Sequence, residues 1–164
     1  MTDSFTPLSE SALKRIRALT VKKYRDQEQQ FLAEGLRLCE EANQAADIIS
    51  AVVTAPSLEQ SRIVDLVKNL PVPVYQATEK QFAQLSETQH SQGVLFVVRQ
   101  PKPRPVGDEP LLLALDALQD PGNVGTLLRT ADWFGIQTIL VGKGTVDIFN
   151  SKVIRSSMGA IFRL

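Results

Sequence analysis

The sequence predicts an α/β protein built from two parts joined by a linker. Segments with strand and helix patterns alternate along residues 30–100, and such alternation is typical of a layered α/β fold. Four prolines then crowd into residues 101–110, where they withhold backbone donors and favour an extended chain. A new apolar run begins directly afterwards. We therefore expect a domain over residues 1–100, a proline-rich linker over 101–110 and a second unit over 111–164.

The first expected element is a helix with an apolar face and a cationic face. Ser9 is a suitable N-cap, and Leu8 can pack on Leu13 as a hydrophobic staple. At helical spacing, the apolar side chains gather on one side while most of the basic ones lie opposite. The basic residues that fall within twelve positions are Lys14, Arg15, Arg17, Lys22, Lys23 and Arg25. This face is either a solvated surface or a contact for nucleic-acid phosphates, and the segment alone leaves both open.

The rest of the first domain alternates between β-branched or apolar runs and amphipathic segments. Strands are expected over residues 30–35, 47–55, 72–77 and 93–100, and helices over 36–46, 57–70 and 78–86. We expect Ser57 near the cap of the second of these helices. Cys39 lies among apolar helix residues and is interpreted as a small buried side chain rather than a reactive thiol.

The second unit is expected to begin with a buried strand followed by a turn and a helix. The run over residues 111–118 suits a strand buried on both faces. Asp120 to Asn123 suit a β-turn with glycine at its third position, which makes Asn123 the expected helix cap. The apolar residues expected to bury one face of the helix are Val124, Leu127, Leu128, Ala131 and Phe134. A strand over 136–141 and a strand-like end over 159–164 complete the unit.

This helix carries an arginine where an anion could be held. Arg129 follows Gly125 by four residues, and helical side chains lean toward the amino terminus, so the guanidinium can reach over the missing side chain. Backbone donors, the positive end of the helix dipole and an arginine would then converge, as at phosphate or oxyanion sites. Capping with a surface ion pair is an equal alternative. A dinucleotide site fits worse, because the glycine spacing of a dinucleotide fingerprint is missing.

Other side chains of the second unit have an ordinary interpretation and a functional one. Trp133 and Phe134 could stack on a base, but at the end of an amphipathic helix the core is favoured. Ser156 and Ser157 are interpreted as turn or cap residues, because their surroundings do not form a nucleophile elbow. Lys152 and Arg155 share a helix face and either extend an RNA site or belong to the plain surface.

Composition excludes several classes of protein. Of 164 residues, 43% are hydrophobic and 22% charged, and no apolar run approaches the roughly 20 residues that cross a bilayer. Cys39 and His90 are the only residues of their types, so disulfide frameworks, zinc hydrolases and Ser-His-Asp enzymes are disfavoured and no metal is expected. We interpret His90 as a polar loop residue. The first residues lack a signal-peptide pattern, so we expect a cytoplasmic protein without a membrane partner.

Two patterns in the second unit resemble a known enzyme family. An N-x-G-x-x-x-R pattern is met by Asn123, Gly125 and Arg129. A D-x-x-N-x-K-x-x-R-x-S-x-G pattern is met by Asp147, Asn150, Lys152, Arg155, Ser157 and Gly159. Together they resemble the first half of the α/β-knot catalytic domain of the SpoU/TrmH RNA methyltransferases, in the SPOUT superfamily. Residues 22–42 and 90–98 resemble the ribosomal-protein-like α/β substrate-binding domain that precedes it.

The resemblance implies an enzyme that transfers a methyl group from S-adenosylmethionine to a ribose 2′-hydroxyl in RNA, above all ribosomal RNA. It implies catalytic roles for Asn123 and Arg129 in a loop with Gly122, Gly125 and Thr126, and a homodimer for the complete enzyme. The residues then expected to contact RNA are Lys14, Arg15, Lys22, Lys23, Arg25, Arg37, Lys152 and Arg155. Arg129 is either the base for the hydroxyl or an anchor for charge; we favour the anchor, because a guanidinium holds its proton too strongly to be a good proton acceptor.

The sequence also departs from the family pattern. The glycine-rich loop with glutamate and the Ser-Leu-Asn segment that hold the cofactor in this family are missing. We therefore expect a truncated chain that is itself inactive, with the cofactor-binding residues beyond Leu164. A non-enzymatic RNA-binding module is the alternative.

Overall fold

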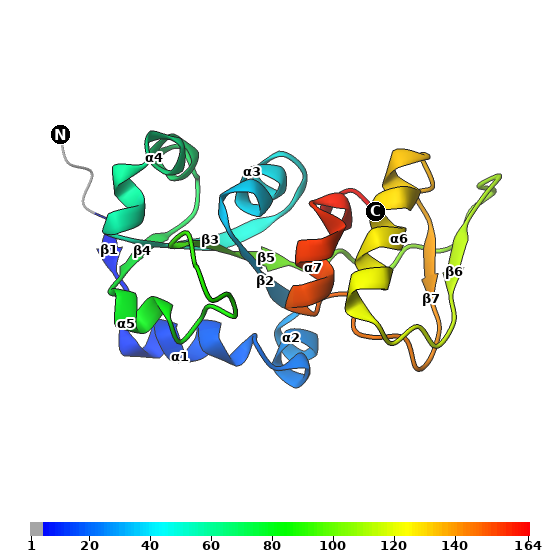
Figure 1. The fold of residues 1–164 in the computed structure, drawn as a ribbon, viewed down its shortest axis with the longest axis horizontal. Coiled ribbons are helices and arrows are strands. Elements are labelled where there is room, and N and C mark those ends of the chain that lie inside the picture. Colours follow the sequence, from blue (N-terminus) through cyan, green and yellow to red (C-terminus); the bar gives the residue numbers. More distant parts are fainter. Residues whose placement is uncertain (1–4) are drawn as a thin grey trace. The chain divides into compact units, whose positions relative to one another are not determined.

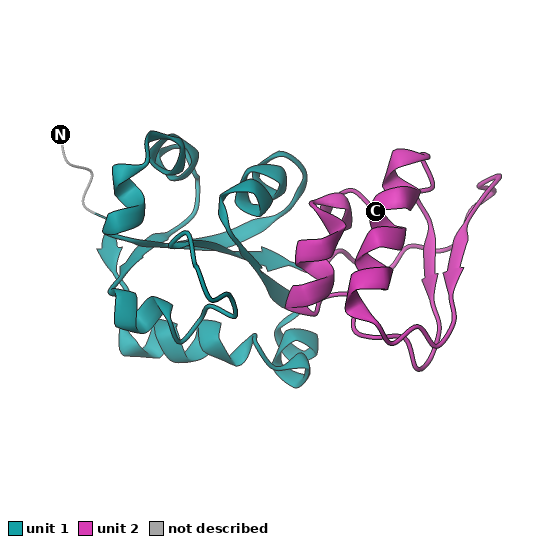
Figure 2. Ribbon diagram, in the orientation of Figure 1, with its two compact units in different colours: residues 1–99 teal, residues 100–164 magenta. Residues whose placement is uncertain are grey.

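The computed structural model describes residues 5–164, which divide into two compact units, 5–99 and 100–164 (Figure 2). The expected linker over 101–110 has no helix or strand, is exposed, and groups with the second unit. The expected α/β class is confirmed in both units.

The first unit is a mixed five-stranded sheet with helices on both faces (Figure 1). The strand order is β1-β4-β3-β5-β2; β1 and β3 run parallel to β4, while β5 is antiparallel to β3 and β2. The strands are β1 (Thr6–Pro7), β2 (Gln30–Glu34), β3 (Ile48–Thr54), β4 (Val74–Ala77) and β5 (Val94–Arg99). The helices are α1 (Glu10–Ala18), α2 (Lys22–Glu28), α3 (Leu36–Ala45), η1 (Pro56–Glu59), α4 (Ser61–Lys68) and α5 (Glu79–Phe82). In Figure 1, α3 and α4 cover one face of the sheet while α1, α2 and α5 lie on the other.

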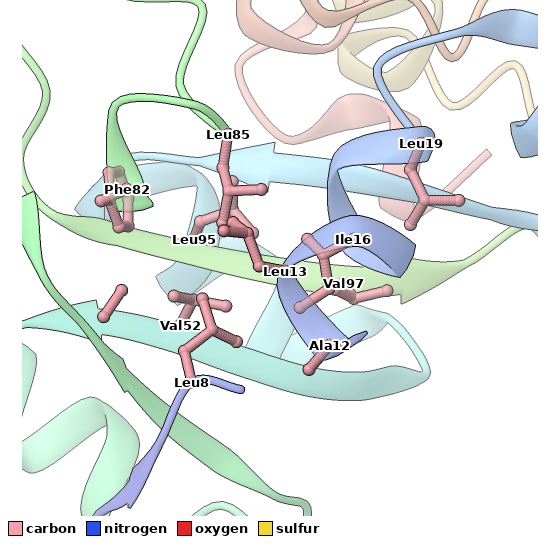
Figure 3. Packing of buried hydrophobic residues seen from close by; sticks show 11 residues of the cluster. Leu8, Ala12, Leu13, Ile16, Leu19, Val52, Phe82, Leu85, Leu95 and Val97 are labelled. Carbon is pink, nitrogen blue, oxygen red and sulfur yellow. The ribbon is translucent and has the colours of Figure 1, made fainter. Parts of the chain in front are cut away.

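The start of α1 forms as the sequence predicts. The Ser9 hydroxyl accepts a hydrogen bond from the Ala12 N–H, and Leu8 and Leu13 are both buried in the same cluster. Figure 3 shows this cluster, in which α1 and the Phe82–Leu85 segment pack on side chains of β3 and β5. The staple therefore fixes α1 on the sheet and leaves its basic side chains outside.

Three local expectations for the first unit are wrong. The basic stretch forms two helices rather than one, because the chain turns at residues 19–21. Ser57 does not cap a long helix; it lies inside the short 3₁₀ turn η1, its hydroxyl bonds the backbone of Thr54, and α4 begins only at Ser61. Strand β1 was not expected, since two residues give no alternation to detect.

Cys39 is buried on α3, as expected, and its thiol donates to the Ala33 carbonyl at 3.4 Å. Burial raises the pKa of the thiol, so the reactive thiolate is suppressed. We expect iodoacetamide to leave Cys39 unmodified in the native protein at neutral pH and to label it once urea unfolds the chain, as mass spectrometry would show. Labelling at equal rates in both states would contradict this burial.

The second unit is a β-α-β arrangement with an additional helix. Its elements are β6 (Leu113–Leu115), α6 (Pro121–Trp133), β7 (Ile139–Val141), α7 (Ser151–Ser157) and η2 (Ala160–Phe162). Strands β6 and β7 are parallel, with Leu113 opposite Ile139. The helices lie on one face of this pair (Figure 1). The expectation of a first strand buried on both faces is therefore wrong: in β6, Leu115 is buried, whereas Ala114, on the opposite face, is exposed. The prediction of a strand-like segment over 159–164 is also wrong, because residues 160–162 form a 3₁₀ turn.

Candidate functional site

Helix α6 begins three residues earlier than the sequence predicted. Asp120 is the N-cap, and its Oδ1 accepts from the Asn123 N–H at 2.7 Å; Pro121 is the first helical residue. Gly122 lies inside the helix without positive φ, and Asn123 is not the cap. The chain's own carboxylate therefore occupies the helix N-terminus, where the sequence suggested an external anion. A site on α6 depends on side chains farther along the helix.

Gly125 lies where α6 crosses α7. A Cβ built on Gly125 would lie 1.9 Å from Ser156 Oγ and 2.8 Å from the Val153 carbonyl oxygen. The Ser156 hydroxyl is within hydrogen-bond distance of the Pro121 carbonyl at 3.1 Å and the Lys152 carbonyl at 2.7 Å. The missing side chain thus allows two helices to approach closely instead of leaving room for an anion. Ser156 belongs to this helix contact and not to a turn.

Arg129 lies on the exposed face of α6. Among residues 5–164 it makes no hydrogen bond or ion pair, whereas Arg163 is held by Asp132 at 2.7 Å. Thr126 and Trp133 share this face, one turn before and one turn after Arg129. The guanidinium is therefore available to an anion from solution.

The interpretation of Trp133 and Phe134, at the end of α6, as buried core residues is wrong. Trp133 is 85% exposed and Phe134 is 73% exposed, so neither is buried by the described chain. Phe134 follows the helix as its C-cap, where the helical period no longer places a residue against the core. Trp133 extends the exposed face that carries Arg129.

Most of the second sequence pattern sets the local fold. Asp147 Oδ1 accepts from the Phe149 N–H, and Asn150 caps α7 by accepting from the Lys152 N–H at 2.9 Å. Ser157 is buried and donates to the Ile154 carbonyl, so it is not a turn or cap residue. Gly159 has φ +94°, which favours glycine. This leaves Lys152, which is exposed, and Arg155, which is half-buried, as the residues of the pattern that could reach RNA.

The expected RNA-contacting residues of the first unit do not form one surface. Lys14 and Arg15 are exposed on α1, and Lys22 and Lys23 on α2, with Lys22 paired to Asp26 at 2.5 Å. Arg37 is exposed on α3, which covers the other face of the sheet (Figure 1). The face of the sheet that α1 and α2 cover therefore carries more of these exposed basic residues than the face that α3 covers.

Arg25 requires a correction. It is 6% exposed, and its guanidinium donates to the carbonyls of Leu19 and Thr20 at 2.9 and 2.8 Å. These carbonyls follow the end of α1, so Arg25 joins α2 to that end. Its role is structural rather than contact with RNA.

We expect Arg25→Met to lower the free energy of unfolding by about 1–3 kcal/mol, because two buried carbonyls lose their donor while the apolar stem is kept. Urea denaturation followed by circular dichroism measures this difference. Arg15→Met, on the exposed side of α1, is the matched control and should stay within about 0.5 kcal/mol of the parent. Equal stability of both variants would contradict the structural role.

A cavity of the second unit, about 410 Å³ in volume, lies between the proline-rich segment and β7. Its charged side chains are Lys102 and Arg104, and no carboxylate lines it. The sulfonium and ammonium groups of the methyl donor are cationic, so two further cations repel them.

Among residues 5–164, no group of three or more His, Cys, Asp or Glu side chains is placed to hold a metal ion. No helix in this part of the chain has the length and apolar character needed to cross a membrane.

Comparisons with known proteins match both units. Residues 10–95 match the MRM3-like substrate binding domain, and residues 110–164 match the SpoU rRNA Methylase family. The chain belongs to the SpoU/TrmH methyltransferase family. It is 34% identical to the 23S rRNA (guanosine(2553)-2′-O)-methyltransferase RlmP of Bacillus subtilis over 89% of this chain and 57% of that protein. It is 30% identical to the human mitochondrial rRNA methyltransferase 3, over 87% of this chain and 36% of that protein.

Solved structures of the family share the fold. A TrmH-family protein from Porphyromonas gingivalis has a TM-score of 0.81 and 39% identity, over 96% of this chain and 61% of that one. An AdoMet-bound rRNA methyltransferase from Sinorhizobium meliloti has a TM-score of 0.75 and 32% identity, over 97% of this chain and 61% of that one. The chain therefore spans little more than half the length of several relatives it matches, and about a third of the mitochondrial one.

Sequence reasoning missed two residues that shape the candidate sites, Asp120 and Tyr24, and favoured the core for Trp133. The aspartate–proline pair at residues 120–121 is a known start signal for helices and would have revealed the cap. Trp133 shares the helical period of Arg129 on the exposed face. Tyr24 lies among the basic residues of α2 and is 41% exposed, which no periodicity predicts in so short a helix.

Proposed function

We propose that this chain supplies the substrate-binding domain and the first part of the catalytic domain of an S-adenosylmethionine-dependent methyltransferase that acts on ribose 2′-hydroxyls of ribosomal RNA. The observation that carries the proposal is Arg129, which is exposed on α6 of a SpoU-family fold and has no hydrogen-bond or ion-pair partner among residues 5–164. Relatives named as rRNA methyltransferases, one of them a 2′-O-methyltransferase and one solved with AdoMet bound, support the reaction class. The homodimer and the cytoplasmic location expected from the sequence are part of the same proposal.

The chemistry requires alignment of the hydroxyl and stabilisation of developing charge. A guanidinium stays protonated near neutral pH, so Arg129 serves as a donor of hydrogen bonds rather than as a base. Its planar fork can bind a phosphate or the forming ribose oxyanion. Lys152 and Arg155 are cations of the second pattern, on α7, and they add charge for the RNA backbone.

The experiment compares this chain with a protein of the full length of its relatives. The full-length protein should methylate ribosomal RNA when S-adenosylmethionine is supplied, and the modified linkage should resist alkaline hydrolysis because the attacking 2′-hydroxyl is blocked. Methylation on a base, which leaves the linkage labile, would overturn the ribose assignment.

The alternative function is an RNA-binding module without catalysis. It is favoured by the cationic lining of the cavity in the second unit, which does not fit the methyl donor. Calorimetric titration of the full-length protein with S-adenosylmethionine separates the two functions. Heat of binding at micromolar concentration supports the enzyme; RNA binding without such heat supports the module.

A further inference from the structure

A groove between α1 and α2 combines an exposed aromatic ring with basic side chains. It has a volume of about 590 Å³, within the range of roughly 300–1,000 Å³ that is typical of small-ligand clefts. Lys14 and Arg17 line it from α1, and Val21 and Tyr24 line it from the α1–α2 turn and α2. Val21 and Tyr24 are both exposed, although they are apolar or aromatic residues in a strongly charged segment.

Tyr24 has the surroundings of a stacking platform. Lys23 Nζ lies over the Tyr24 ring, 5.8 Å from its centroid, which is a cation–π contact. Proteins that bind single-stranded RNA place bases on aromatic rings and track the backbone with lysine and arginine. The groove offers both groups within one turn of α2.

The charge of the groove is positive. Glu10 is the acidic residue in its lining, against Lys14 and Arg17, with Lys23 adjacent. The end of α1 would add negative partial charge, but the buried Arg25 binds the Leu19 and Thr20 carbonyls there. Arg25 is therefore a positioning residue that holds α2 against α1 and keeps the groove suited to phosphate.

We propose that the α1–α2 groove holds an unpaired nucleotide of the RNA substrate, with its base stacked on Tyr24 and the flanking phosphates on Lys14 and Lys23. The proposal rests on the proposed function in taking RNA as the partner, and it specifies single-stranded RNA at this site. Stacking accepts any base, since every base has a π face. The site therefore supplies affinity for an unpaired segment rather than sequence recognition.

The first test measures binding of the 164-residue chain to a fluorescein-labelled oligouridine and to an RNA duplex of equal length. Tyr24→Ala should weaken binding of the single strand by about 5- to 150-fold and leave duplex binding unchanged, because paired bases cannot reach the ring. Tyr24→Phe keeps the aromatic face and should restore parental affinity. Circular dichroism of each variant confirms that the fold is retained.

The second test separates charge from stacking by salt dependence. The Lys14→Ala/Lys23→Ala variant should reduce the slope of log affinity against log salt by about 1.4, because each single-strand phosphate contact contributes about 0.7. Tyr24→Ala should keep the parental slope. Lys68→Ala, an exposed lysine at the end of α4, is the matched control and should change neither slope nor affinity.

The outcomes distinguish this inference from the proposed function. Loss of affinity in the lysine variant together with parental binding by Tyr24→Ala overturns the stacked base but keeps RNA as the partner. Parental binding by both variants overturns the groove as an RNA site. Failure of the chain to bind either RNA at low salt overturns both the groove and the RNA partner of the proposed function.

Discussion

Arg129→Lys is expected to lower kcat for ribose methylation about 100-fold in a full-length protein that carries these residues. Lysine keeps the positive charge but loses the planar fork that binds two oxygens at once. Because Arg129 is exposed and makes no internal contact among residues 5–164, the change should leave the thermal midpoint of unfolding unaltered. Steady-state methyl transfer to ribosomal RNA gives kcat and KM separately.

The pH profile of this variant distinguishes an anchor from a base. A lysine has a pKa of about 10.4, below that of arginine, so a base at this position would gain activity in the variant as pH rises. If Arg129 is an anchor, the variant should show the same dependence of turnover on pH as the parent, with lower turnover at every pH. Arg62→Lys is the matched control, because Arg62 is paired to Glu40 at 2.8 Å in the first unit and should keep parental turnover. Near-parental turnover of Arg129→Lys would remove Arg129 from the catalytic residues.

The sequence predicted the elements whose burial follows a period. Strand β5 is a continuous apolar run and is buried along almost all of its length, as expected for a central strand. The start of α1 was also predicted, since its cap and staple are local in sequence. In both cases, neighbouring residues carry the whole signal.

Contacts between distant segments could not be predicted in this way. Arg25 was grouped with the basic residues around it, but the turn at residues 19–21 directs its guanidinium to carbonyls of the chain. Gly125 was interpreted as space for an anion, and its true neighbour is Ser156, thirty-one positions later. No local pattern reports how closely two helices cross.

In the candidate site, too, the features set by neighbouring residues were predicted and those set by tertiary packing were not. The residues of the α6 pattern were found by spacing and resemblance, and Arg129 is exposed as an anion site needs. The cap was misplaced because four residues that suit a β-turn also suit a helix start with proline in its first position. The choice between them depends on whether the following helix packs, which is a tertiary property.

Gly125→Ala is expected to destabilise the second unit by about 1–3 kcal/mol or more. The added methyl group would lie 1.9 Å from Ser156 Oγ and 2.7 Å from its Cβ, and 2.8 Å from the Val153 carbonyl oxygen. The serine hydroxyl can rotate away, but a backbone carbonyl cannot, so α6 and α7 must separate. Hydrogen exchange read by mass spectrometry should show faster exchange of amides in both helices.

Gly122→Ala is the matched control for Gly125→Ala, on the same helix. Its added Cβ would meet only the Asp120 carboxylate at 3.2 Å, and alanine stabilises helices over glycine by roughly 0.5–1 kcal/mol. The two substitutions should therefore have opposite signs, although helix propensity favours both equally. Adding Ser156→Gly to Gly125→Ala should restore part of the lost stability but not all, because the Val153 carbonyl still opposes the methyl group. Equal stabilisation by both alanines would show that the helices do not cross at Gly125, and the close α6–α7 contact would then have to be abandoned.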